Sequence, residues 1–313
     1  MPNMEHQPTS ERLLIVDGHA YAYRAFHAIQ KLNGPDGAPT NAIYGFIKMF
    51  LKMGTTLKPT HHCVVWDGGL CAQRMEALPE YKIHRPPMPG DLERQLPEIE
   101  SFLEAARVPS FVNEGVEADD WIASQACCAA RVGVDVVIAS ADKDFLQLVS
   151  PRVGLLNPND KSETIWKEEQ VRAKTGLAPE QVVDWLSLIG DAVDNIAGVP
   201  GVGPKTATDL LKQFGTIEQI YARLGEVKSE RIRASLLAAQ PEVRRNQKLI
   251  QLHTDMPCNF DLPQLAVLPG DPDRLAPLYE KWGFKTMRAQ LDSPPRGAMA
   301  GREVAVGAQK ELL

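Results

Sequence analysis

Hydrophobic positions in the first half of the chain form short runs, and each run leads to acidic residues. Three runs have the length and composition of buried strands. They and the carboxylates that follow them are residues 13–16 before Asp17, residues 63–66 before Asp67, and residues 134–139 before Asp142 and Asp144. We therefore predict strands that deliver carboxylates at their C-terminal ends.

Helical periodicity occurs between these predicted strands. In residues 92–106 the apolar positions Leu92, Leu96, Ile99 and Leu103 recur at the spacing of one helix face. Strands that alternate with helices favour an α/β fold with a mostly parallel, doubly wound sheet. In such sheets ligands bind beyond the C-terminal ends of the strands, so carboxylates far apart in sequence can converge there.

The pattern changes in the second half. From about Pro179 helical segments alternate with Gly and Pro, and residues 195–204 are rich in helix-breaking residues. We predict an N-terminal extension over residues 1–12, an α/β domain over 13–185 and a helical domain over 186–292. Residues 293–313 lack periodicity, and we expect them to form a flexible tail.

Composition excludes several classes of protein. Of 313 residues, 44% are hydrophobic and 24% charged, and no apolar segment approaches the roughly 18 residues of a membrane span. The polar N-terminus lacks the features of a secretory signal, so we expect a cytoplasmic protein, as a monomer. The five cysteines include no C-x-x-C pair, which favours free thiols over a disulfide framework or a zinc site.

The acidic residues form a pattern that suggests metal binding. Besides the acids after the strands, Glu117, Asp119 and Asp120 cluster at a predicted helix start, and Asp191 and Asp194 follow later. Carboxylate oxygens suit Mg²⁺ or Mn²⁺ rather than zinc. Each group taken alone is equally compatible with helix capping or a turn, and only their joint occurrence favours a site.

Longer motifs carry a resemblance to a known family. They are residues 14–18 (LIVDG), 23–27 (YRAFH), 81–92 (YKIHRPPMPGDL), 115–120 (GVEADD), 142–144 (DKD) and 190–207 (GDAVDNIAGVPGVGPKTA). These blocks resemble the bacterial 5′-3′ exonuclease, or flap endonuclease, family, and look closest to the 5′-nuclease domain of bacterial DNA polymerases I. The resemblance implies a PIN-like sheet followed by a helix-three-turn-helix element that grips DNA.

The resemblance also implies roles for the acids. By the family pattern, two ions, Mg²⁺ or Mn²⁺, would be held by nine carboxylates. The first ion would be held by Asp17, Asp67, Glu117, Asp119 and Asp120, and the second by Asp142, Asp144, Asp191 and Asp194. Such a pair of ions activates a water and stabilises the leaving oxygen in phosphodiester hydrolysis.

Basic and aromatic residues are expected to contact DNA. By resemblance, Lys82, Arg85 and Arg24 would contact the scissile and nearby phosphates, although a solvated basic loop is the alternative. Residues 74–92 look like the helical arch under which a free 5′ strand passes. Within this segment Tyr81 could stack on an unpaired base.

The glycine-rich segment from Gly198 to Thr206 is the second expected DNA contact. Its residues Gly198, Gly201 and Gly203 precede Lys205 and Thr206 at a predicted helix start, which would aim backbone N–H groups at a phosphate. In the family this hairpin often carries K⁺ as well. Loop punctuation alone is the other interpretation.

The sequence therefore predicts a metal-dependent nuclease that acts on DNA with a free 5′ end, flap, nick or branch. Two alternatives remain at this point: a DNA-structure-binding protein with little catalysis, and another metal phosphohydrolase, such as a PIN-type ribonuclease or a phosphatase. The histidines show no ligand spacing, and we assign them no role.

Overall fold

The computed structural model describes residues 11–160, 162–257 and 261–292. The predicted tail and most of the predicted N-terminal extension lie outside these ranges. Within them, no helix has the length and apolar character needed to cross a bilayer.

A six-stranded sheet forms the centre of the molecule, in the order β3-β2-β1-β4-β5-β6. Its first five strands in this order pair in parallel, and only β6 runs antiparallel. The strands are β1 (Arg12–Asp17), β2 (His61–Trp66), β3 (Ser110–Val112), β4 (Asp135–Ala139), β5 (Val153–Leu156) and β6 (Ile165–Trp166). The predicted parallel sheet is confirmed, including all three runs that precede carboxylates.

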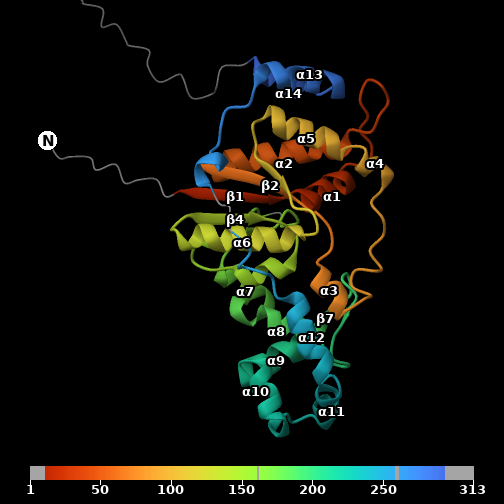
Figure 1. Cartoon of the computed structure of the whole chain (residues 1–313), viewed down its shortest axis with the longest axis vertical. Helices are drawn as coiled ribbons and strands as arrows, with labels where there is room; N and C mark the ends of the chain where they lie inside the picture. Colours follow the sequence, from red (N-terminus) through yellow and green to blue (C-terminus); the bar gives the residue numbers. More distant parts are fainter. Residues whose placement is uncertain (1–10, 161, 258–260, 293–313) are drawn as a thin grey trace, which may run out of the picture.

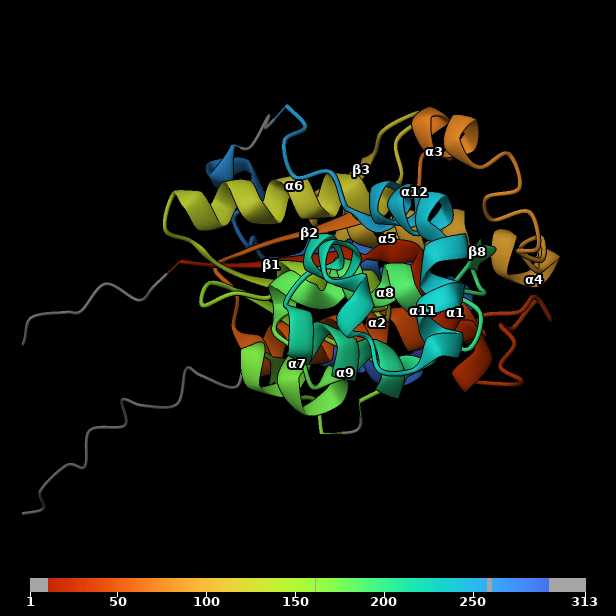
Figure 2. The same cartoon turned by 90° about the horizontal axis from the view of Figure 1, so that it is seen from below.

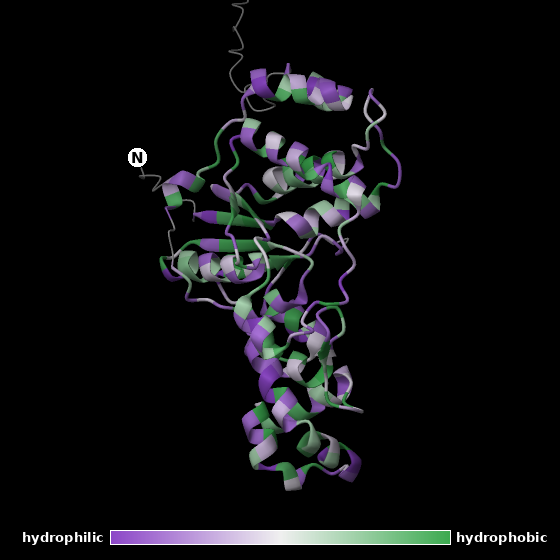
Figure 3. Ribbon diagram, turned by 45° about the vertical axis from the view of Figure 1, so that its right-hand side comes forward, coloured by the Kyte–Doolittle hydropathy of each residue, from purple (hydrophilic) through white to green (hydrophobic). Residues whose placement is uncertain are grey.

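Helices cover both faces of this sheet, as alternate residues of each strand require. Leu14 and Val16 of β1 face one side, whereas Leu13 and Ile15 face the other. On the first face lie α1 (Gly18–Ala28), α2 (Asn41–Leu57), α4 (Gly90–Glu93) and α5 (Leu96–Ala105). On the second lie α6 (Ala118–Arg131) and the 3₁₀ helix η1 (Lys143–Leu148). Figure 1 shows these layers, and Figure 3 shows apolar residues along the strands between them.

A second helical region extends from the α/β part, downward in Figure 1 and toward the viewer in Figure 2. It has its own core, which includes Leu188, Leu211, Phe214 and Leu236. Its elements are α8 (Val182–Ile189), the short hairpin β7 (Gly190–Asp191) and β8 (Ile196–Ala197), α9 (Pro204–Phe214), α10 (Ile217–Ala222), α11 (Glu230–Ala238) and α12 (Gln240–Ile250). The remaining elements of this half of the structure are the helices α3 (Ala72–Ala77) and α7 (Glu168–Thr175) and the 3₁₀ turns η2 (Pro179–Gln181) and η3 (Leu224–Glu226).

The last two helices depart from the predicted organisation. The helical region was expected to continue to residue 292, but α13 (Pro272–Trp282) and α14 (Lys285–Leu291), which follow the turn η4 (Leu262–Leu265), pack on the α/β part. Tyr279, Trp282 and Phe284 belong to the same buried cluster as Phe102 and Leu103 of α5. Helical periodicity identifies such a helix but does not reveal which apolar face receives it.

The cysteines bring one correction. Cys63, Cys71 and Cys127 are free, as predicted, but Cys128 is disulfide-bonded. Pairing depends on the distance between two Cα atoms in the folded chain, which sequence spacing does not report.

Candidate metal and nucleic-acid site

Six of the nine expected carboxylates line one cavity at the C-terminal edge of the sheet. The cavity has a volume of about 400 Å³ and also contains the side chains of Lys82, Arg85 and Lys143. The six carboxylates are those of Asp17, Asp67, Asp119, Asp142, Asp191 and Asp194. The parallel strands β1, β2 and β4 all end at this edge, which brings together residues that are more than a hundred positions apart.

Two of these acids are also helix caps. The backbone N–H of Ala20 donates to Oδ1 of Asp17 (3.0 Å), and the N–H of Asp144 donates to Oδ1 of Asp142 (2.8 Å). The hydroxyl of Ser140 donates to the other oxygen of Asp17 (2.7 Å). These bonds fix the carboxylates at the cavity wall, so capping and site formation are compatible roles for the same residues.

The crowded carboxylates have raised pKa values. Burial raises the pKa of Asp17 to about 6, with smaller contributions from the neighbouring Asp142 and Asp67. Burial likewise raises the pKa of Asp119 and of Asp144 well above the ordinary value, and nearby carboxylates add to this effect. In addition, the buried oxygen Oδ1 of Asp144 has no hydrogen-bond partner. Buried acids in this state gain from a bound cation.

Three basic side chains balance part of the negative charge of these carboxylates. Nζ of Lys82 lies 3.0 Å from Glu117, Nη2 of Arg85 lies 2.5 Å from Asp194, and Nζ of Lys143 lies 3.2 Å from Asp191. The backbone of Lys82 has a φ of 57°, in the left-handed region, and its N–H donates to the carbonyl of Asp194 (3.1 Å). The basic residues are therefore within reach of any anion that enters the cavity.

Three of the nine expected ligands, Glu117, Asp120 and Asp144, do not line the cavity, and their assignment as ligands stays a prediction. Glu117 and Asp120 have other partners. Both contact the buried guanidinium of Arg74, which forms two bonds to Asp120, at 2.7 and 2.8 Å. Asp120 also accepts from the backbone N–H of His253 (2.9 Å). A carboxylate that satisfies Arg74 on both oxygens points away from the edge where Asp17 and Asp119 meet.

The acids of the cavity are not arranged as a ready-made metal site. Among the described residues, no three His, Cys, Asp or Glu side chains stand close enough together to hold a metal ion as they are placed. The donor chemistry nevertheless fits hard divalent cations, because the lining offers six carboxylates. Asp144, which follows the lining residue Lys143, has an unpartnered oxygen as well, although it is not part of the lining. Binding would require Lys143 and Arg85 to release Asp191 and Asp194.

Two of the residues expected to contact DNA, Tyr81 and Arg24, do not line the acidic cavity. Tyr81 is only 4% exposed, and its hydroxyl lies 3.4 Å from both Glu117 and Asp194, so its ring offers no stacking face. Arg24 is exposed but lines a neighbouring cavity rather than the acidic one. The helical period of α1 explains the second difference, since Ala20 and Tyr23 occupy the face toward the acids.

The glycine-rich hairpin has the geometry that its sequence suggested. A Cβ at Gly198 would lie 2.3 Å from the carbonyl oxygen of Ile189, and Gly201 has a φ of 81°, so glycine is required at both positions. Gly201, Gly203 and Lys205 are exposed at the start of α9, and Thr206 is half-buried. The segment therefore presents free backbone to solvent at a helix N-terminus.

Sequence reasoning missed several residues of the site. Lys143 lies between the predicted ligands Asp142 and Asp144. Its position in the sequence could have identified it as a residue of the site. His19 lines the cavity and accepts from the backbone N–H of Asp67 through Nδ1 (3.1 Å), with a pKa lowered by burial. Ser140 and Arg74 carry no signal in sequence, because their roles depend on contacts between distant segments.

In chelator, we expect the contribution of Asp17 to lower the melting temperature as the pH rises from about 4 to about 7, and to be constant above that. Folded Asp17 keeps its proton up to a pKa of about 6, whereas the unfolded carboxyl loses it near 3.8. The stability contributed by this protonation is present at low pH and lost as the pH rises through the folded pKa. Calorimetry of wild type and Asp17→Asn should show a flatter pH dependence for the variant. Identical slopes would contradict the assignment.

Comparison with known families gives a match along most of the chain. The model of the "5'-3' exonuclease, N-terminal resolvase-like domain" matches residues 12–176, and the model of the "5'-3' exonuclease, C-terminal SAM fold" matches residues 177–273. Both halves of the fold, the mostly parallel sheet and the helical region, are therefore accounted for.

Relatives of two kinds share this similarity. A 5'-3' exonuclease of Aquifex aeolicus is 35% identical over 90% of this chain and 95% of its own length. The DNA polymerase I of Bacillus caldotenax is 38% identical over 91% of this chain, but the matched part is 33% of the polymerase. The chain thus spans about a third of the polymerases that it matches.

Solved structures show the same fold at low identity. A T5 5'-exonuclease with zinc bound matches 90% of this chain and 98% of its own with a TM-score of 0.65 and 22% identity. The catalytic core of Rad2 in complex with a DNA substrate matches 90% of this chain and 91% of its own, with a TM-score of 0.60 and 18% identity. At these identities the likeness concerns the fold.

Proposed function

Since the chain belongs to the 5'-3' exonuclease family, we propose that it hydrolyses phosphodiester bonds in DNA that carries a free 5′ end or flap, with divalent cations bound in the acidic cavity. The observation that supports this most directly is one cavity that combines six carboxylates with Lys82, Arg85 and Lys143. The carboxylates are suitable ligands for metal ions, and the lysine and arginine side chains can bind the phosphate. We expect a role in DNA replication and repair. The predictions of a monomer and of a cytoplasmic location stay predictions.

We assign the carboxylates to two metal sites. Asp17, Asp67 and Asp119 would hold one Mg²⁺ or Mn²⁺, and a second group, made up of Asp142, Asp144, Asp191 and Asp194, would hold the other. A bound pair would supply a water of lowered pKa and neutralise charge on the leaving oxygen. Glu117 and Asp120 would act indirectly, because Glu117 positions Lys82 and Asp120 positions Arg74.

Lys82 and Arg85 would orient the substrate. Arg85 is half exposed and can exchange Asp194 for a phosphate oxygen, which its guanidinium can contact at two points. Lys82 is buried, lines the cavity and is held by Glu117, so its position is fixed before substrate arrives. A fixed cation stabilises charge that develops on the phosphate during hydrolysis.

DNA would be gripped outside the cavity by two segments. The exposed backbone of Gly201 and Gly203, with Lys205 and Thr206, would contact phosphates of the duplex, and K⁺ could be held by carbonyls of the same hairpin. Residues 74–92, which contain the end of α3, several turns and α4, would form the arch beside the free 5′ strand. This segment contacts the second region directly, since Asn195 donates to the carbonyl of Glu80 (3.0 Å).

Cleavage assays on matched substrates test this proposal. We expect Mg²⁺-dependent release of a labelled 5′ flap from DNA, no release in EDTA, and recovery when Mg²⁺ is added back. A nicked duplex, a single strand and an RNA flap of the same sequence define the preference. Cleavage that persists in EDTA would overturn metal dependence, and faster cleavage of the RNA flap would favour the alternative of a ribonuclease.

A further inference from the structure

A second cavity lies beside the acidic one, and helix α1 is the wall between them. Ala20 and Tyr23 face the acidic cavity, whereas Tyr21 and Arg24, three residues apart and so on one face of the helix, line a cavity of about 300 Å³. Its volume is at the lower end of the range for small-molecule sites. Nothing in the function proposed above uses this space.

The floor of this cavity is apolar. Met49, Met53 and Leu57 of α2 and Leu156 of β5 line it. Methionine side chains adapt their shape to a ligand, and their sulfur atoms make favourable contacts with the edges of aromatic rings. The floor therefore suits a flat, largely apolar group better than a simple anion.

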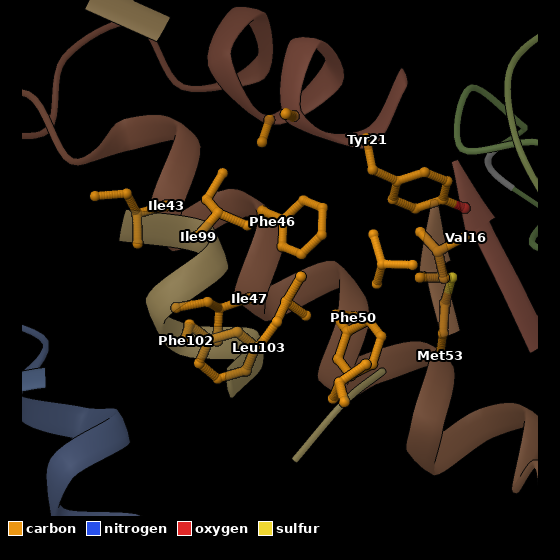
Figure 4. Packing of buried hydrophobic residues seen from close by; sticks show 14 of the residues in the cluster. Val16, Tyr21, Ile43, Phe46, Ile47, Phe50, Met53, Ile99, Phe102 and Leu103 are labelled. Carbon is orange, nitrogen blue, oxygen red and sulfur yellow. The ribbon is translucent and has the colours of Figure 1, made fainter. Parts of the chain in front are cut away.

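Tyr21 brings a polar atom that lacks a partner. The residue is only 2% exposed, and its hydroxyl forms no hydrogen bond with any residue that the structure describes. In Figure 4 the phenol oxygen points away from the cluster around Phe46 and Ile99. Because Tyr21 lines the cavity, a ligand with a donor or acceptor could form a hydrogen bond with this hydroxyl without displacing a protein partner.

The charges around the cavity leave one cation unpaired. Lys52 pairs with Glu163, which joins α2 to the segment before β6. Asp160 accepts from Nε1 of Trp166 (2.7 Å) and from the backbone N–H of Ser162 (2.9 Å). Arg24, by contrast, forms no ion pair or hydrogen bond within the described part of the chain, so its guanidinium is free for an anion.

From these contacts we propose that the cavity binds one nucleotide. The base would lie against Met49, Met53 and Leu156, one of its polar edges would bond to Tyr21, and its phosphate would pair with Arg24. The source of the nucleotide rests on the proposed function. It is either an unpaired nucleotide of the DNA substrate next to the cleavage site, or a free mononucleotide.

Methyl NMR of the full chain tests this inference without activity. With ¹³C-methyl methionine, in EDTA, titration with dAMP or with an uncleaved 5′-flap DNA should shift the Met49 and Met53 signals by the ring current of the base. The buried Met287 of α14 lies away from the cavity and should stay unchanged. Inorganic phosphate, which has no ring, should leave the cavity methyls unshifted. Shifts with DNA alone identify a substrate nucleotide, and shifts with dAMP identify a free one.

A conservative variant isolates the hydroxyl. Tyr21→Phe should weaken the nucleotide affinity measured at Met53 by about 5- to 10-fold, as expected for one hydrogen bond. Tyr44→Phe, which alters a half-buried ring over Phe284 instead, should leave it unchanged. If neither dAMP nor flap DNA shifts Met49 and Met53, the inference is overturned even when flap cleavage is normal. Shifts without any nuclease activity would overturn the proposed function and leave this site standing.

Discussion

Replacing Asp142 and Asp144 together by asparagine is expected to lower the rate of flap cleavage by at least about 10³-fold, because both carboxylates are proposed metal ligands. Affinity for flap DNA should change little in chelator, or rise slightly, since the phosphate contacts remain and two negative charges leave the cavity. Single-turnover cleavage and fluorescence anisotropy would measure the two effects separately.

A surface carboxylate provides the control for this experiment. Asp273 is exposed in the first turn of α13, far from the cavity, and Asp273→Asn should retain full cleavage and binding. Loss of DNA binding in the double variant would show that these acids support the fold or the grip rather than catalysis. Unchanged cleavage would remove them from the proposed ligand set.

Replacing Arg74 by methionine is expected to destabilise the protein by about 3 to 5 kcal/mol. The guanidinium is 4% exposed and joins Glu117, Asp120 and the carbonyl of Leu249 (2.9 Å). Without it, Asp120 loses its main counter-charge, Glu117 keeps only its ion pair with Lys82, and a carbonyl near the end of α12 loses its donor. Urea denaturation would report the change in the free energy of unfolding.

The exposed ion pair of Arg94 with Asp91 offers a matched control. Both side chains are largely exposed, so Arg94→Met removes a pair of the same type without leaving a buried charge. We expect its effect to be a small fraction of that at Arg74. Comparable losses in the two variants would mean that burial of Arg74 does not determine its contribution.

Sequence predicted the sheet and the edge of the site because both depend on local pattern. Asp17 and Asp67 follow apolar runs whose length and composition indicate buried strands, and the rule that parallel strands end together brings the acids to one cavity. Arg74 could not be predicted, since its partners come from α6 and α12, which only the folded chain brings near α3. Arg24 and Tyr81 were assigned by resemblance, and their orientation depends on which face of a helix or turn is buried.

Helix α8 carries a consequence for how the molecule unfolds. Val182 and Leu186 belong to the core beneath the sheet, whereas Leu188, two residues later, belongs to the core of the helical region. Fraying of this one helix would remove side chains from both cores at once. We therefore expect the two matched regions to melt in one cooperative transition, and we expect strain imposed by DNA on the segment of residues 198–206 to reach the α/β core through α8.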